Sequence, residues 1–259
     1  MKQIVVRASF IFLAIYMLTL PLSSFGASHR AVISNNPLFQ GANSIFIADY
    51  GDIWLAAGFL AHTLCAYLQL KTSKFDLLAN RILKYLLHST FSVLFNVWFF
   101  GPLIVERLNV ATGGHCTESG PSAPSMPECR RNPTSLWVDG FDISGHYYFV
   151  VTLSLLLMDS ILRTETHKNV IFQESTLNHL AQDHSILRQR AQKASKVVSI
   201  CAVVLMTIWV MEFCVTSVFF HTAWEKALGL LGVPIILVVL MISDEICIVR
   251  SNVGPDIMV

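Results

Sequence analysis

The chain has 259 residues, of which 54% are hydrophobic and 14% charged, whereas charged residues supply about 25% of an ordinary soluble domain. Its mean hydropathy is +0.57, which indicates a membrane protein. The 18 Lys and Arg residues nearly balance the 17 Asp and Glu residues, for a formal net charge of +1. Without a basic field to attract phosphates, we expect no nucleic acid as a partner.

Six stretches of the sequence are apolar and long enough to cross a bilayer. A spanning helix needs roughly 20 mostly apolar residues, because lipid offers unpaired backbone groups no partner. We therefore expect an all-α integral membrane protein, a six-transmembrane helix bundle that forms a single membrane domain over residues 1–259. The expected spans run over about 8–25, 53–70, 85–105, 145–162, 197–220 and 227–248.

The first of these spans also has features of a signal peptide. Lys2 and Arg7 precede its apolar run, and small residues at 24–27 offer a cleavage site. The run is longer than the roughly 7 to 15 apolar residues of a signal peptide core. We interpret it as a retained span, with a cleaved signal as the alternative.

The positive charges predict the orientation of the bundle, because Lys and Arg accumulate on cytoplasmic loops. If the amino terminus is cytosolic, that side holds 13 of the 18 Lys and Arg residues. Both termini are then cytosolic, the loop 163–196 is a cytosolic amphipathic helix on the membrane surface, and 106–144 is a lumenal loop. The five remaining cations on the lumenal side are Arg30, Arg107, Arg130, Arg131 and Lys226.

Two of the six cysteines, Cys116 and Cys129, lie in an aqueous loop. This loop is the predicted lumenal one, and disulfides persist on the oxidising side of a membrane. We predict a disulfide between them, with two free thiols as the alternative. The cysteines inside spans are interpreted as small apolar residues, and none has the spacing of a zinc site.

Two of the nine histidines lie at helix ends on the predicted lumenal face. His146 begins the fourth span and His221 follows the fifth. These spans are joined by a cytosolic loop, so they run antiparallel and place both histidines at the same depth. We predict that they share one site. From position alone, the alternative is a pair of interfacial histidines that anchor helix ends.

A pair of imidazoles suits phosphoryl or pyrophosphoryl transfer. The neutral ring attacks phosphorus in line and the protonated ring donates a proton to the leaving oxygen. Histidine fits both roles, because an ordinary pKa of about 6.5 lets small environmental shifts separate the two protonation states.

The residues before His146 are also candidates for this site. Gly145 allows close approach of a substrate to the backbone, and the Ser144 hydroxyl would face a phosphate together with the free N–H groups of the helix end. Asp142 is a candidate cap for this helix. No cluster with metal-ligand spacing accompanies the histidines, so we expect a metal-independent site without a cofactor.

One further carboxylate, Glu212, lies in the middle of the fifth span. A charged group inside a membrane is costly enough to suggest a partner or a function. Helix geometry directs it roughly opposite His221, so we interpret it as a polar contact inside the bundle, with Asn96 as one possible partner, and leave a functional role open.

The strings GFDISGH and FFHTAWEKALG, the two loop cysteines before the first string, and the six spans together resemble the fat storage-inducing transmembrane (FIT) family, particularly its fungal members. That family is similar to lipid phosphate phosphatases, whose signatures include Ser-Gly-His and a later histidine followed four residues on by an acid. The resemblance implies that His221 is the nucleophile, His146 the general acid and Glu225 the group that orients His221.

The sequence departs from the phosphatases in the cations that bind phosphate. Those enzymes have an Arg shortly before the later histidine, whereas residues 215–220 read VTSVFF here. Lys226 is the cation nearest to His221 in the sequence and is included among the supporting residues of the candidate site.

The FIT resemblance implies an acyl-CoA diphosphatase of the endoplasmic reticulum membrane, with fatty acyl-CoA as substrate. Cleavage of the CoA pyrophosphate at the lumenal face would release acyl-phosphopantetheine and adenosine 3',5'-bisphosphate, and would support lipid droplet formation and phospholipid balance. Neutral lipids and phospholipids are the expected membrane partners. Two alternatives are a non-catalytic scaffold that binds di- and triacylglycerol and a phosphatase acting on phosphatidate.

Overall fold

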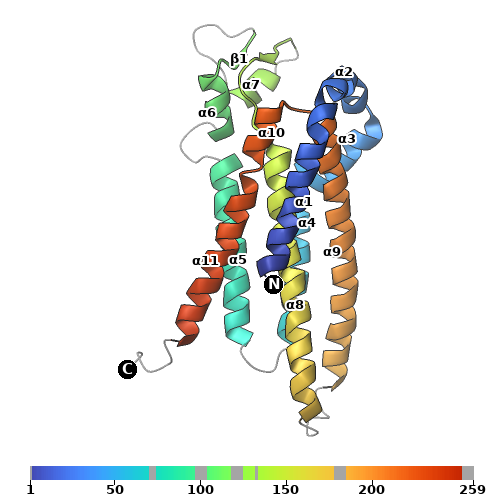
Figure 1. The fold of residues 1–259 in the computed structure, drawn as a ribbon, viewed down its shortest axis with the longest axis vertical. Helices are drawn as coiled ribbons and strands as arrows, with labels where there is room; N and C mark the ends of the chain where they lie inside the picture. Colours follow the sequence, from blue (N-terminus) through green and yellow to red (C-terminus); the bar gives the residue numbers. More distant parts are fainter. Residues whose placement is uncertain are drawn as a thin grey trace.

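The computed structural model describes residues 2–69, 74–96, 104–117, 125–131, 134–177 and 185–252 (Figure 1). The longer helices are α1 (Lys2–Thr19), α2 (Ser23–Ser34), α4 (Gly51–Gln69), α5 (Lys74–Asn96), α8 (Gly145–Leu177), α9 (Ser185–Phe219) and α11 (Gly232–Asn252). The shorter elements are η1 (Leu20–Leu22), α3 (Pro37–Asn43), the π-helix η2 (Ser44–Ala48), α6 (Ile104–Ala111), β1 (His115–Cys116), α7 (Met126–Arg131), β2 (Trp137–Val138) and α10 (Ala223–Gly229).

The long helices form an elongated bundle with α8 at its centre (Figure 1). In the spanning part of α8, 67% of the residues are buried, more than in any other spanning helix of the described residues. Its neighbours include α1, α4, α9 and α11. The start of α8 is therefore surrounded by other elements, and it carries His146.

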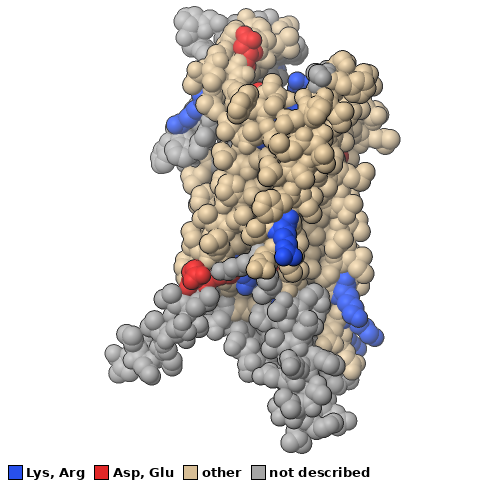
Figure 2. All heavy atoms as spheres, viewed as in Figure 1, with Lys and Arg blue, Asp and Glu red and all other residues tan. Residues whose placement is uncertain are grey.

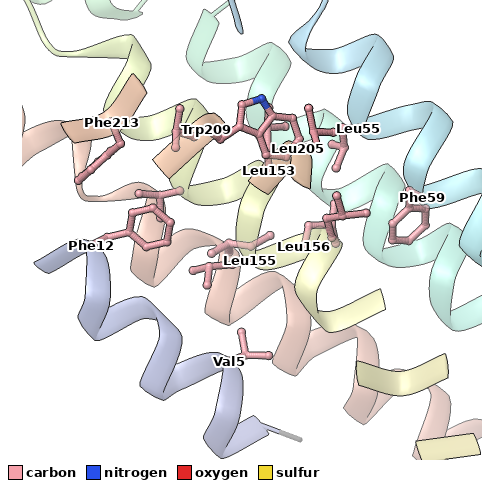
Figure 3. Packing of buried hydrophobic residues seen from close by; sticks show 14 of the residues in the cluster. Val5, Phe12, Leu55, Phe59, Leu153, Leu155, Leu156, Leu205, Trp209 and Phe213 are labelled. Atoms are coloured by element: carbon pink, nitrogen blue, oxygen red, sulfur yellow. The ribbon is translucent and has the colours of Figure 1, made fainter. Parts of the chain in front are cut away.

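Apolar side chains from several helices fill the space around α8 (Figure 3). Trp209 of α9, Leu55 of α4 and Leu153 of α8 are almost fully buried. Phe12 of α1 packs edge-on against Phe213 of α9, with ring centroids 5.1 Å apart. Inside a bilayer such van der Waals packing, rather than removal of apolar surface from water, holds helices together. The first helix thus contributes side chains to the core.

Five helices of the described residues are long and apolar enough to cross a membrane, so the chain is a multi-pass membrane protein. They coincide with five of the six predicted spans and cover Gln3–Leu22, Gly51–Gln69, Gly145–Thr164, Gln189–Phe219 and Ala223–Ile246. The remaining predicted span, 85–105, overlaps α5, which ends at Asn96 and is followed by 97–103, outside the described residues. Six spans therefore stay a prediction.

The ends of the bundle differ in the elements that they carry. One end carries α6, α7 and β1, and the start of α1 and the end of α11 lie away from it (Figure 1). Most of the visible face between the two ends carries neither sign of charge (Figure 2). We call the end with α6, α7 and β1 the predicted lumenal end.

We predict that both chain termini are cytosolic. An acceptor tag for N-linked glycosylation placed after Val259 should stay unmodified in microsomes, whereas the same tag inserted between residues 118 and 124 should be modified. The shift in gel mobility, with and without a glycosidase, measures both. A modified tag after Val259 would contradict the orientation and remove the basis for a lumenal site.

The segment 163–196 differs from the expected surface helix. α8 continues to Leu177 and α9 begins at Ser185, with 178–184 outside the described residues. The sequence from 163 to 196 contains neither Gly nor Pro, the residues that most often end a helix. The two spanning helices therefore extend past the apolar region instead of leaving a separate helix on the membrane.

An ionic network joins α5, α8 and α11 in the half of the bundle away from the predicted lumenal end. The Lys84 ammonium lies 2.6 Å from the Asp159 carboxylate and 3.1 Å from that of Asp244. Arg163 binds the same two carboxylates. Buried charges are tolerated when they are paired, and this pairing accounts for an aspartate near the end of the last span.

The predicted lumenal loop contains a small ordered unit. β1 and β2 pair antiparallel, with Cys116 opposite Trp137. Cys129 of α7 is disulfide-bonded to Cys116 in the structure, with the two Cα atoms 5.8 Å apart. The bond connects α7 to the β1–β2 hairpin, and it is the pairing that the sequence predicts.

We predict that this disulfide is present in the protein isolated from membranes. A non-reduced digest should contain one peptide pair linked through Cys116 and Cys129, and reduction should separate it in mass spectrometry. Recovery of both cysteines as individually alkylated thiols, without prior reduction, would contradict the prediction.

Candidate active site

The first candidate residue, His146, lies in the first turn of α8, which begins at Gly145 as predicted. Its Nε2 lies 2.6 Å from the side-chain oxygen of Asn43, the last residue of α3. An amide oxygen only accepts hydrogen bonds, so this contact places a proton on Nε2. A Cβ built on Gly145 would meet no atom within 4 Å, which leaves open space beside His146.

The cap of α8 differs from the expected one. Ser144 is fully buried, and its hydroxyl accepts a 3.4 Å hydrogen bond from the Tyr147 backbone N–H. This is the position and pattern of a helix N-cap. The hydroxyl therefore caps the helix instead of facing a substrate, and Asp142 does not cap it, because Ser144 occupies the residue directly before the helix.

The second candidate residue, His221, lies in the short connection between α9 and α10. Its backbone has φ +58°, in the left-handed region that few non-glycine residues adopt. Such a conformation costs on the order of 1–3 kcal/mol and persists only where the surroundings fix it. Here the following helix does so: the Thr222 hydroxyl accepts from the Glu225 N–H, and the Glu225 carboxylate accepts from the Thr222 N–H.

Glu225 also connects the two histidine-bearing segments. While one of its carboxylate oxygens caps α10, the other accepts a 3.0 Å hydrogen bond from the Asp142 N–H. Its backbone carbonyl accepts another from the Ser144 N–H at 3.2 Å. A single residue of α10 therefore holds the loop that leads into α8, two residues before His146.

Close helix packing keeps these segments together. A Cβ built on Gly229 of α10 would lie only 2.6 Å from the Ser144 carbonyl oxygen and from the Tyr147 Cβ. Only glycine permits this approach. The structure thus holds the segments that carry the two histidines against each other at the predicted lumenal end.

Two carboxylates face one ring nitrogen of His221. Its Nδ1 lies 3.8 Å from Glu225 Oε2 and 3.9 Å from Asp142 Oδ2. These distances exceed a hydrogen bond, but catalytic contacts are often long before substrate binds. Carboxylates favour a proton on Nδ1, which leaves the lone pair of Nε2 for attack on an electrophile.

The surroundings also keep this ring neutral. Burial lowers the pKa of His221 below its ordinary value; the carboxylates of Asp142 and Glu225 oppose this shift, and the charge of Arg30 adds to it. Burial disfavours the charged form because a cation loses its hydration. A neutral imidazole near pH 7 is the state that a nucleophile requires.

Lys226 lies at the site but is oriented toward the protein. It is almost fully buried, and its ammonium donates a 2.7 Å hydrogen bond to the Ser217 carbonyl of α9. The structure thus gives this residue a contact between α10 and α9. Its role toward a phosphate, inferred from proximity in the sequence, has no support in this geometry.

Two residues near the histidines were missed in the sequence. Asn43 contacts His146, and Arg30 lies over the ring of Phe220, the residue before His221. Both come from the region between the first two spans, where short helices carry no clear periodicity. The one usable signal is that Arg30 belongs to the few cations on the predicted lumenal side.

Glu212 is buried in α9, and one of its carboxylate oxygens has no hydrogen-bond partner among the described residues. The side chain of Asn96, its suggested partner, lies outside the described residues. Glu212 therefore stays separate from the histidine site as the structure describes it.

The described part of the chain contains no group of three or more His, Cys, Asp or Glu side chains arranged to hold a metal ion. The functional groups of the site are two imidazoles, two carboxylates and one nearby guanidinium. Together with the spanning helices, they define a multi-pass membrane protein with a histidine site at one end of its bundle.

Comparisons with known proteins identify the family within this class of membrane proteins. The model of the family described as "Fat storage-inducing transmembrane protein" matches residues 40–241, and the chain belongs to this family. The matched region includes both histidines, Asn43 and Glu225, and the family predicted from the sequence is therefore confirmed.

Two fungal proteins are similar to the chain. Acyl-coenzyme A diphosphatase YFT2 of Saccharomyces cerevisiae is 30% identical over 163 residues, which cover 62% of this chain and 54% of that protein. Acyl-coenzyme A diphosphatase fit1 of Schizosaccharomyces pombe is 26% identical over 231 residues, or 86% of this chain and 80% of that protein. The first match thus spans about half the length of the relative. No solved structure matches the chain significantly.

Proposed function

We propose that this protein is a fatty acyl-CoA diphosphatase of the endoplasmic reticulum membrane. It cleaves the pyrophosphate of CoA at the lumenal face and yields acyl-phosphopantetheine and adenosine 3',5'-bisphosphate, in support of lipid droplet formation and phospholipid balance. Family membership and the printed activity of both fungal relatives support this assignment.

One observation carries the proposal. His221 has a neutral ring whose Nδ1 faces two carboxylates, while the Nε2 of His146 contacts the side-chain oxygen of Asn43. The two rings therefore have different environments, which is how a pair of like groups divides nucleophilic and acid roles. A scaffold that only binds neutral lipid has no need for this division.

The proposed reaction has two steps. Nε2 of neutral His221 attacks one phosphorus of the pyrophosphate, the P–O bond of the anhydride breaks, and protonated His146 donates a proton to the leaving oxygen. Water, deprotonated by His146, then attacks the phosphohistidine and releases the second product with His221 free again. Glu225 and Asp142 stabilise the charge that His221 acquires during attack. No step uses a metal ion.

The experiment is a product analysis with purified protein in detergent micelles and a chelator present. With oleoyl-CoA as substrate, adenosine 3',5'-bisphosphate and oleoyl-phosphopantetheine should appear in equal amounts. Dioleoyl phosphatidate, tested in parallel, should release little inorganic phosphate. Phosphate release from phosphatidate without cleavage of oleoyl-CoA would favour the phosphatase, and no product from either substrate would favour the lipid-binding scaffold.

A further inference from the structure

Cleavage of a pyrophosphate requires a cation near the reacting phosphorus. Negative charge spreads over the phosphoryl oxygens in the transition state, and most phosphoryl-transfer sites stabilise this charge with Arg, Lys or a metal ion. The segment before His221 contains no basic residue. The Lys226 ammonium is bound to the Ser217 carbonyl, so this need is not met by the residues that the sequence singles out.

Arg30 of α2 lies next to the nucleophile. Its guanidinium carbon is 5.5 Å from the ring centroid of Phe220, the neighbour of His221. The side chain is exposed, and no carboxylate of the described residues pairs with it. An arginine that stacks on an aromatic ring keeps its N–H donors at the edge of the guanidinium plane available for other partners.

The fold holds this arginine in position. Gly26, one turn before Arg30, contacts the backbone of α9 so closely that a Cβ would collide with the Val218 carbonyl oxygen. The Phe220 ring stacks with Phe39 of α3 at 5.7 Å between centroids and 13° between planes. α2, α3 and the end of α9 therefore form one packed unit around the guanidinium.

We propose that Arg30 binds the phosphate oxygens of the substrate pyrophosphate beside His221, an inference that rests on the function proposed above. The planar guanidinium donates two parallel N–H bonds to one phosphate, which positions the phosphorus and offsets its charge during attack. Arg30 thus supplies from the first part of the chain the cation that the residues around His221 lack.

Arg30 has a second, measurable effect on the nucleophile. Its charge lowers the pKa of His221. Removal of that charge raises the pKa, so the pH below which His221 becomes protonated and inactive moves upward. A residue that only packed α2 against α9 would not move this limb of the pH profile.

The test compares Arg30→Ala, Arg30→Gln and Arg30→Lys with Arg131→Ala, which removes an exposed arginine on the same end of the bundle. The kcat/KM for oleoyl-CoA should fall about 100-fold in the Ala and Gln variants, as when a transition-state donor is removed. The Lys variant should recover part of the loss, and Arg131→Ala should match the wild type. Binding of inorganic pyrophosphate, measured by equilibrium dialysis, should weaken about tenfold in the Ala and Gln variants, a change in binding free energy of about 1.4 kcal/mol.

The outcomes separate this inference from the proposed function. If the wild-type protein does not cleave oleoyl-CoA, the proposed function is overturned. If the wild type cleaves it and the Arg30→Ala and Arg30→Gln variants are equally active, only the role of Arg30 is overturned. Unchanged pyrophosphate binding in folded variants overturns that role whatever the activity. If Arg30→Ala elutes as aggregate, the near-isosteric Arg30→Gln variant decides.

Discussion

His221→Ala should reduce acyl-CoA hydrolysis by at least about 1,000-fold in folded protein. The substitution removes the proposed nucleophile, and general acid catalysis alone typically contributes about 10² to 10⁴ in rate, so loss of the covalent step should cost at least as much. The measurement is kcat for oleoyl-CoA with purified variants that elute as the wild type does. His115→Ala is the control, because His115 is exposed in the lumenal loop, away from the two candidate residues.

The pH dependence of the wild type provides an independent check on His221. Activity falls on the acid side as the nucleophile takes up a proton, and burial lowers the pKa of His221. The acid limb of kcat/KM should therefore lie below pH 6.5, the ordinary value of a histidine. An acid limb above this value would contradict a neutral His221 as the nucleophile. A His221→Ala variant as active as the control would favour the lipid-binding scaffold.

His146→Ala is expected to lower kcat by about 10² to 10⁴, the range for loss of a general acid. The leaving oxygen would then depart without a proton, which slows the breaking of the anhydride bond. Asn43→Ala should have a smaller effect, because the Asn43 side chain contacts the His146 ring and a partner of this kind orients the ring and fixes its tautomer.

The control for this pair is a change at a nearby amide that does not contact a histidine. Asn36 caps α3 through its side-chain oxygen, and Asn36→Ser keeps a capping group. It should leave both kcat and the pH profile as in the wild type. A His146→Ala variant with the kcat of the wild type would assign the acid role to another group.

The placement of both histidines at one end of the bundle was predictable because it depends on few assumptions. Two consecutive spans joined by one loop run antiparallel. The residue that begins the first span and the residue that follows the second therefore lie at the same end of the bundle, whatever the arrangement of the other helices. The start of α8 at Gly145 followed in the same way from the point where the apolar run begins. Both inferences use only local sequence and the thickness of a membrane.

The partners of the histidines were less predictable. Asn43 and Arg30 are more than 100 residues from His146 in the chain, in short helices whose packing depends on Gly26 and Phe39. Sequence reasoning assigned the cap of α8 to Asp142 because aspartate is a good cap, but the contact of Glu225 with the Asp142 backbone shifts the cap to Ser144. Lys226 turned inward for a similar reason, since the cap of α10 sets the direction of each side chain in that helix.

The packing of α1 has a consequence for how the protein is made. Tyr16 donates a hydrogen bond to the Ala223 carbonyl of α10 and packs edge-on against Tyr147 of α8, so the first helix to leave the ribosome contacts one of the last. The active site therefore cannot assemble during the synthesis of the intervening spans. A nascent chain lacks His221 until α9 has been synthesised, so the proposed site can be complete only when translation is nearly finished.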